Sequence, residues 1–324
     1  MKILLCNKSY PKAEKALMAL APGNEIISCD PENAAAHLDG VDIIIPSVAR
    51  VDADLIKRGQ FGLIQQLGVG LDNVDIAAAS AAGVFVANVP GAGSGNTESV
   101  AELAILHMLA LSRNLFQAQK NFFDSVFFKP AGVALLNKQV CIIGLGDIGK
   151  ALALRLRPFA VKMTALREHP EHGAPEECGI EKVYGLKDLH TALAAADFVV
   201  LAIPETDSTR NLIDKAALAA MKKGSYLINV GRGGVVEREA LYQALNSGHL
   251  AGAGLDVFWE EPANPEHPLY KENLVLTPHL GGNTDESLKG VVRIIAENIK
   301  LFNEGKRPRH LQNELLVESP RRPV

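Results

Sequence analysis

The segment that decides the fold is Gln139-Val-Cys-Ile-Ile-Gly144-Leu-Gly146-Asp147-Ile148-Gly149-Lys150. An apolar run rich in β-branched residues ends at the first glycine, and an Ala- and Leu-rich helical pattern follows the turn. In this setting the three glycines allow a tight turn, close approach of the backbone to a pyrophosphate and close helix–strand packing. The N–H groups at the start of the helix favour the same anion. We therefore predict a dinucleotide-binding turn at residues 144–149, the alternative being a glycine-rich turn without a ligand.

Outward from this turn, short β-rich runs alternate with Ala- and Leu-rich stretches, which is typical of a parallel sheet with crossover helices. The fold class is α/β. One strand series is expected at residues 2–6, 42–45, 63–67 and 84–87, with helices at 13–20, 52–57 and 75–82. A second series of six strands is expected at residues 139–143, 162–166, 198–202, 226–229, 254–257 and 274–277. Two longer helices are expected at residues 97–121 and 285–303, and His107 lies on an apolar face of the first, as a core residue would.

Length and composition limit the kinds of partner. The chain has 324 residues, enough for two domains, and a net charge of −4 with no cluster of basic residues. We expect a cytoplasmic protein that binds neither nucleic acid nor membrane, since no apolar run approaches the length of a membrane span. The four cysteines have no metal-ligand spacing, so neither disulfides nor a metal site is expected.

The residues after the next strand bear on cofactor choice. A dinucleotide-binding unit usually carries an acid there, which binds the ribose 2′-hydroxyl of NAD. Here Arg167 stands at that point, and its guanidinium suits a 2′-phosphate, so NADP is favoured over NAD. Glu168 could still take the ribose role if the strand ends one residue later, and His169 could add a donor to a phosphate.

Three ionisable residues follow strands of the second series, at the sheet edge where open α/β sheets bind ligands. They are Arg232 in NVGRGGVVE (229–237), Glu261 in LDVFWEEP (255–262) and His279 in LTPHLGG (276–282). An acid of near-neutral pKa, a carboxylate that favours its protonated form and a cation that grips an anionic substrate are what the reduction of a 2-oxo acid needs. Taken singly, His279 could equally cap a helix and Glu261 could equally be a solvated loop acid. Arg232 could form a surface ion pair, but the glycines around it, which allow close backbone approach, favour a functional role.

These segments, with GLGDIG (144–149), QQLGVGLDNVD (65–75) and NTESVAELA (96–104), resemble the D-isomer-specific 2-hydroxyacid dehydrogenases over nearly the whole chain. The resemblance implies that His279 is the acid/base, that Glu261 is its carboxylate partner and that Arg232 binds the substrate carboxylate. It also implies substrate contacts from Gly68, Val69 and Gly70. The further cofactor contacts that it implies are Asp147, Ile148, Pro204, Thr209, Val230, Gly231 and Asp256.

The expected architecture is a Rossmann-type doubly wound sheet, residues 98–287, inserted in a smaller flavodoxin-like substrate domain, residues 1–97 and 288–324. The resemblance implies a homodimer. The helix at 97–121 and the Phe-rich loop after it are apolar enough to be buried by a partner, the alternative being burial within the chain.

Among branches of the family, the Arg-led cofactor site resembles glyoxylate/hydroxypyruvate reductases, so a small anionic 2-oxo acid is the expected substrate. Formate-oxidising relatives are disfavoured, since they carry an amide where this chain has Glu261. D-3-phosphoglycerate dehydrogenase is the second choice, because Pro46 stands where that branch often has Arg and the sequence has no room for an added regulatory domain. A cofactor-sensing scaffold without catalysis is the alternative from another class.

Overall fold

The computed structural model describes residues 1–8, 10–313, 317 and 321. The chain divides into two compact units, one formed by Met1–Asn96 together with Asn283–Val324 and the other by Thr97–Gly282. The second boundary between the units lies at residues 282 and 283, whereas the sequence predicts it after residue 287. The difference arises because the whole of the last helix, α10 (Asp285–Asn303), packs into the first unit.

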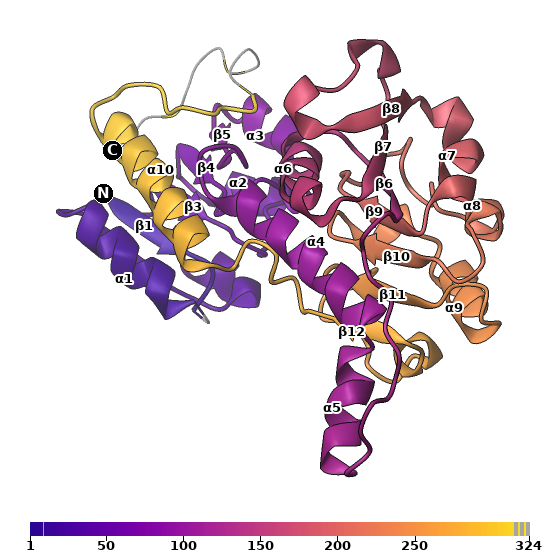
Figure 1. The fold of residues 1–324 in the computed structure, drawn as a ribbon. Helices are drawn as coiled ribbons and strands as arrows, with labels where there is room; N and C mark the ends of the chain where they lie inside the picture. Colours follow the sequence, from indigo (N-terminus) through magenta and orange to yellow (C-terminus); the bar gives the residue numbers. More distant parts are fainter. Residues whose placement is uncertain (9, 314–316, 318–320, 322–324) are drawn as a thin grey trace. The chain divides into compact units, whose positions relative to one another are not determined.

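The unit formed by Thr97–Gly282 contains a seven-stranded parallel sheet (Figure 1) in the order β12-β11-β10-β9-β6-β7-β8. Its strands are β6 (Gln139–Ile143), β7 (Lys162–Leu166), β8 (Ile180–Tyr184), β9 (Phe198–Leu201), β10 (Tyr226–Asn229), β11 (Gly252–Leu255) and β12 (Leu274–Leu276). Counted from β6, the order 3-2-1-4-5-6 is that of a dinucleotide-binding sheet, with one further strand at the β12 edge. The carboxyl ends of these strands carry Arg232, Asp256 and His279.

Both faces of this sheet are buried, as a doubly wound fold requires. Alternate residues of β6 point to opposite faces: Cys141 and Ile143 belong to one hydrophobic cluster, and Val140 and Ile142 to the other. The first cluster includes residues of α7 (Leu189–Ala195), α8 (Lys215–Ala220) and α9 (Arg238–Asn246). The second includes residues of α4 (Asn96–Ser112) and α6 (Asp147–Leu156).

The other unit has a five-stranded parallel sheet in the order β2-β1-β3-β4-β5. Its strands are β1 (Lys2–Leu5), β2 (Glu25–Ser28), β3 (Ile43–Ile45), β4 (Leu63–Gln65) and β5 (Phe85–Ala87). This order is that of flavodoxin-like sheets. Helices α1 (Pro11–Leu20) and α10 lie side by side on one face (Figure 1), and α2 (Ala53–Arg58) and α3 (Ile76–Ala81) supply residues to the cluster on the other. The α/β class and both sheet types predicted from the sequence are confirmed.

Two sheet strands were absent from the sequence prediction. Strands β2 and β8 lie at sheet edges, and β8 exposes Glu181 and Lys182 to solvent. Charged residues are common on edge strands, where they discourage pairing with another chain, and they mask the apolar pattern that marks a strand. The predicted series of six strands is therefore a sheet of seven.

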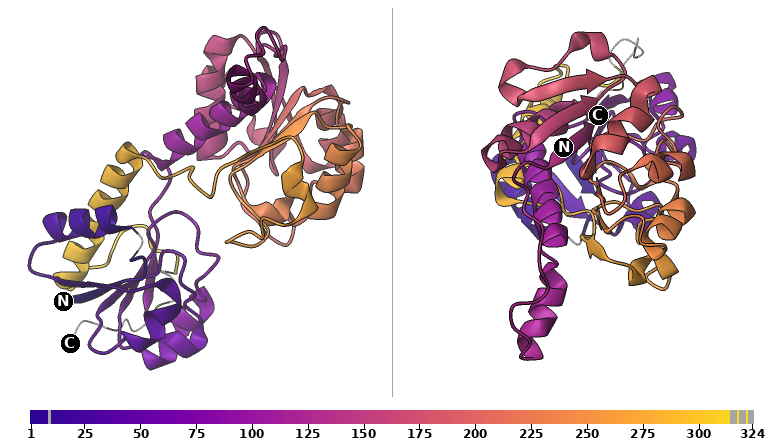
Figure 2. Two further views of the ribbon diagram at one scale, coloured as in Figure 1. Left: turned by 90° about the horizontal axis from the view of Figure 1, so that it is seen from below. Right: turned by 45° about the vertical axis from the view of Figure 1, so that its right-hand side comes forward.

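The single helix predicted at residues 97–121 is wrong. It is two helices, α4 and α5 (Leu115–Phe123), because Asn114 adopts a left-handed conformation with φ of 50° between them. Asparagine enters this region more readily than most residues, so a chain without Gly or Pro can still end a helix there. Figures 1 and 2 show α5 extending beyond the sheet of its unit. Across the described residues, no helix is long and apolar enough to cross a membrane.

Candidate active site

The central feature of the site is a hydrogen-bonded pair between His279 and Glu261. His279 Nδ1 lies 2.7 Å from Glu261 Oε2, and the other carboxylate oxygen of Glu261 accepts a bond of 3.1 Å from the backbone N–H of Phe258. Both oxygens therefore have a partner, which fixes the carboxylate. The imidazole is half exposed, so its second nitrogen, Nε2, is the one that can exchange a proton with a bound molecule.

The pair shifts both pKa values. The hydrogen bond to Glu261 raises the pKa of His279 above that of a free imidazole, although burial and the charge of Arg232 oppose the shift. Burial would raise the pKa of Glu261, but the bond to His279 and the charges of His279 and Arg232 hold that pKa below its usual range. The pair therefore stabilises the protonated imidazole beside the ionised carboxylate.

Arg232 lies in the turn after β10, and Asn229, the last residue of that strand, holds the turn. The Asn229 side chain donates to the Arg232 carbonyl (2.9 Å) and accepts from the Gly231 N–H (3.0 Å). A Cβ atom at Gly233 would overlap the backbone of Phe258, so the turn can pack directly against the segment that leads to Glu261. This glycine explains why Arg232 and Glu261 come together although they belong to different loops.

Asp256 holds the turn that contains His279. Its carboxylate accepts bonds from the backbone N–H groups of Leu280 (2.7 Å) and Gly281 (2.9 Å), and its carbonyl accepts one from the N–H of His279 (2.8 Å). The residue is only 2% exposed. His279 itself has a φ of 55°, a conformation that non-glycine residues rarely adopt, and these three bonds stabilise it.

The glycine turn has the properties that its sequence indicated. Gly144 has a φ of +102°, and a Cβ atom at Gly149 would overlap the Gly144 carbonyl, so the helix start packs against the strand end only because residue 149 is glycine. A Cβ at Gly146, in contrast, would meet nothing within 4 Å. The backbone at Gly146 is thus open to a ligand at the start of α6, which carries Asp147 and Ile148 in its first turn.

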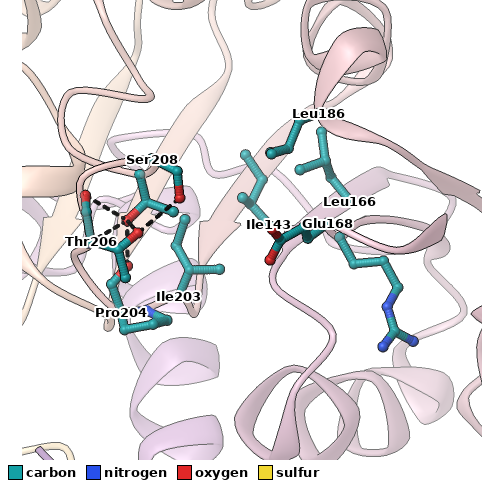
Figure 3. Close-up of a pocket in the computed structure, with 10 residues that line it drawn as sticks. Ile143, Leu166, Glu168, Leu186, Ile203, Pro204, Thr206 and Ser208 are labelled. Carbon is teal, nitrogen blue, oxygen red and sulfur yellow. Dashed lines mark hydrogen bonds between the residues drawn. The ribbon is translucent and has the colours of Figure 1, made fainter.

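Beside this turn is a cavity of about 270 Å³ (Figure 3). Figure 3 shows Ile203, Pro204, Thr206 and Ser208 on one side of it and Ile143, Leu166, Glu168 and Leu186 on the other. Arg167 and Thr209 also line the cavity. Its walls are thus the segments that follow β7 and β9, on either side of β6. An adenosine group next to a pyrophosphate at Gly146 would have this cavity available to it.

Polar bonds order the cavity walls. Thr209 Oγ1 donates to the Pro204 carbonyl (2.7 Å), and Arg167 Nη1 donates to the Gly173 carbonyl (3.1 Å). Val230 is buried, and a Cβ atom at Gly231 would overlap the carbonyl oxygen of Ile203. The expected cofactor residues thus lie along the carboxyl edge of one sheet.

The loop Gly68-Val69-Gly70 belongs to the other unit, where it follows β4. The Gly68 carbonyl accepts from the Val89 N–H (3.0 Å), and the Val69 carbonyl accepts from the Asn88 side chain (2.9 Å). The Val69 side chain is 46% exposed. The loop is therefore held through its carbonyl groups and presents its apolar side chain to solvent within its own unit.

Sequence reasoning did not single out Asn229 or Thr277. Asn229 is fully buried at the end of β10, and Thr277 donates a 2.6 Å bond to Asp256 Oδ1. The available signal was position, since each polar residue ends an apolar run directly before Arg232 or His279. Within the described residues no cluster of His, Cys, Asp or Glu has the form of a metal site.

The unit combines a dinucleotide-binding sheet and a glycine turn with Arg232, Glu261 and His279 at the carboxyl ends of its strands. This combination is typical of nicotinamide-dependent oxidoreductases. Residues 105–281 match the NAD binding domain of the D-isomer specific 2-hydroxyacid dehydrogenases. This match covers more than half of the chain, and the chain belongs to that family.

Relatives that differ in substrate resemble the chain to a similar degree. It is 36% identical to a glyoxylate reductase of Thermococcus litoralis over 86% of each chain. It is also 36% identical to a D-3-phosphoglycerate dehydrogenase of Archaeoglobus fulgidus, over 85% of this chain but 52% of that protein, so it spans about half the length of that relative.

Among solved structures, an NADPH-dependent glyoxylate/hydroxypyruvate reductase of Sinorhizobium meliloti superposes with a TM-score of 0.82. It shares 28% identity with the chain, and the match covers 99% of both chains.

Proposed function

We propose that the protein reduces a small 2-oxo acid to the D-2-hydroxy acid with a nicotinamide cofactor, or runs the reverse oxidation. The observation that carries this proposal is the His279–Glu261 pair at 2.7 Å, in the same unit as Arg232 and the open glycine turn. A proton donor, a fixed cation and a cofactor-binding turn are the groups that this reaction needs.

A bound nicotinamide cofactor would supply the hydride to C2 of the substrate. Gly146 and the helix start would hold its pyrophosphate, and Pro204, Thr209, Val230, Gly231 and Asp256 are the further residues proposed to contact it. The Arg232 guanidinium binds the substrate carboxylate through its planar fork and orients C2. His279 donates the proton on Nε2 to the carbonyl oxygen, and Glu261 stabilises the imidazolium before the transfer. Gly68, Val69 and Gly70 are also proposed to contact the substrate.

The favoured substrates are glyoxylate and hydroxypyruvate. The experiment that tests this choice is a panel of glyoxylate, hydroxypyruvate, pyruvate, 2-oxoisovalerate and 3-phosphohydroxypyruvate with both reduced cofactors. We expect the highest kcat/KM with one of the first two. Preference for the phosphorylated acid would select the D-3-phosphoglycerate dehydrogenase alternative. Tight cofactor binding without turnover of any acid would indicate a cofactor-sensing scaffold instead.

The glycine turn gives a matched pair of variants. Gly149→Ala is expected to lower the free energy of unfolding by about 1–3 kcal/mol, because its Cβ overlaps the Gly144 carbonyl. Gly146→Ala should unfold like the wild type, since its Cβ meets nothing within 4 Å, yet bind cofactor more weakly. Thermal unfolding and cofactor titration measure the two effects. Unchanged cofactor affinity in Gly146→Ala would show that the pyrophosphate does not bind at this turn.

We also propose that the cofactor is NADP(H). Arg167 follows β7 and lines the cavity, and a bond to the Gly173 carbonyl orders its guanidinium. Arg167→Ala is expected to raise KM for NADPH about tenfold and leave KM for NADH nearly unchanged, because a charge-assisted bond to a phosphate is lost. Glu168→Gln is the matched variant and should improve NADPH use. If the ratio of KM for NADPH to KM for NADH is the same in the wild type and Arg167→Ala, the proposal of NADP(H) is contradicted.

Finally, we propose a homodimer that buries the apolar surface of α5 and the loop after it. Phe122, Phe123, Phe127 and Phe128 are between 63% and 102% exposed. An apolar patch of this kind marks an interaction surface. Light scattering should give twice the chain mass for the wild type and a smaller mass for Phe123→Ser/Phe127→Ser. A monomeric wild type would exclude the dimer.

A further inference from the structure

The proposed reaction gives no role to a buried histidine of the unit formed by Thr97–Gly282. His107 lies on α4 and is completely buried. A Cβ atom at Gly254 on β11 would come within 2.8 Å of the His107 Cβ, so this glycine makes room for the imidazole against the sheet. The strand–helix contact thus holds the ring in one place.

Hydrogen bonds connect this imidazole to the turn of His279. His107 Nε2 lies 3.0 Å from Thr277 Oγ1, and Thr277 Oγ1 donates to Asp256 Oδ1 at 2.6 Å. A hydroxyl has one hydrogen, so the bond between His107 and Thr277 requires Nε2 to be the donor. Nε2 of His107 therefore carries a proton, and burial lowers the pKa of the ring, against the charge of Asp256 and a backbone bond with Gly254, which favours the neutral form.

The chain of bonds ends at the catalytic turn. Asp256 accepts the N–H groups of Leu280 and Gly281 through its carboxylate and the N–H of His279 through its carbonyl. The left-handed backbone of His279 depends on these bonds. A fixed direction for the Thr277 hydroxyl therefore orients the Asp256 carboxylate. That carboxylate in turn holds the turn that contains His279.

We propose that His107 is a positioning residue, which orients His279 toward Glu261 through Thr277 and Asp256. This inference rests on the proposed function in one respect, namely that His279 is the residue that transfers the proton. The charged groups that face His279 are Glu261, Asp256 and Arg232, and the one that faces His107 is Asp256. A neutral donor at His107 leaves the Asp256 charge in place while it orders the hydroxyl between them.

The test is an NMR titration of the His279 ring in the protein without cofactor, which needs no turnover. In His107→Leu we expect the pKa of His279 to fall toward that of a free imidazole, because the turn no longer holds the ring against Glu261. Thr277→Val breaks the same chain of bonds without a large cavity and should lower this pKa as well. His107→Gln keeps an N–H donor and should restore the wild-type titration.

The matched control is His249→Leu, which removes a histidine bonded through Nε2 to the Leu218 carbonyl (3.0 Å), away from these bonds. It should lower thermal stability and leave the His279 titration unchanged. In reduction assays, His107→Leu and Thr277→Val should each lower kcat about tenfold, with the double variant no worse than either one. A wild-type His279 titration in folded His107→Leu and Thr277→Val would overturn the proposal, whether or not the protein reduces 2-oxo acids.

Discussion

Replacement of His279 by alanine is expected to lower kcat for 2-oxo acid reduction by about 10³-fold, because a positioned general acid contributes on this scale. Cofactor affinity should stay at the wild-type level, since the glycine turn and its cavity lie beside other strands of the sheet. Steady-state kinetics and a fluorescence titration of the reduced cofactor measure the two quantities. His249→Ala, a histidine outside the site, is the control.

The pH dependence of this reaction follows from the His279–Glu261 pair. The pKa of His279 is raised, so the proton donor is present below that pKa, and the rate of reduction should fall as the pH rises through it. Glu261→Gln removes the carboxylate that raises the pKa, so the fall should occur at lower pH. Oxidation of the 2-hydroxy acid needs the neutral imidazole and should show the opposite dependence. Retained turnover in His279→Ala, or an unshifted pH profile in Glu261→Gln, would contradict this mechanism.

The second large effect is expected at Arg232. Arg232→Ala should lower kcat/KM for a 2-oxo acid by about 10²- to 10³-fold, because the substrate carboxylate loses its charged partner. Arg232→Lys keeps the charge but not the planar fork, and it should recover only part of the loss. The kinetic constants of the three proteins on one substrate are the measurement.

Arg210 provides the control for this change. It forms an ion pair with Glu205, at 2.6 Å, in the same unit, and its side chain is 62% exposed. A pair with one member exposed to solvent contributes little, so Arg210→Ala should keep wild-type kinetics. Equal losses in Arg210→Ala and Arg232→Ala would show that a general change of charge, and not a bond to the substrate, causes the effect.

The sequence predicts most of the fold because buried parallel strands are apolar runs between turn residues. It misses β8, where Glu181 and Lys182 interrupt the pattern on an edge strand. It also misses the break at Asn114, because no Gly or Pro marks it. In both places the deciding factor is the tertiary setting, namely which strand lies at the edge and where the chain must turn.

Some features of the site could likewise be predicted from the sequence, and others depend on tertiary contacts. The glycine turn and the Arg–Glu–His set follow from motifs, since each lies in a segment that follows a strand of one sheet. The bonds that orient the set do not: Asn229, Thr277 and His107 act through contacts between elements far apart in the sequence. His107 was expected to be a core residue and is buried, but its bond to Thr277 appears only when α4 packs beside the end of β12.

Whether the protein reduces 2-oxo acids is decided by following the hydride of the cofactor. The protein is incubated with the reduced nicotinamide cofactor, deuterated at the transferable C4 position, and with glyoxylate or hydroxypyruvate. The product is analysed by NMR and chiral chromatography. We expect deuterium at C2 of the 2-hydroxy acid, with the D configuration when hydroxypyruvate is the substrate, and incorporation about 10³-fold slower with His279→Ala. A cofactor that keeps its deuterium in the presence of each 2-oxo acid of the panel would contradict the account.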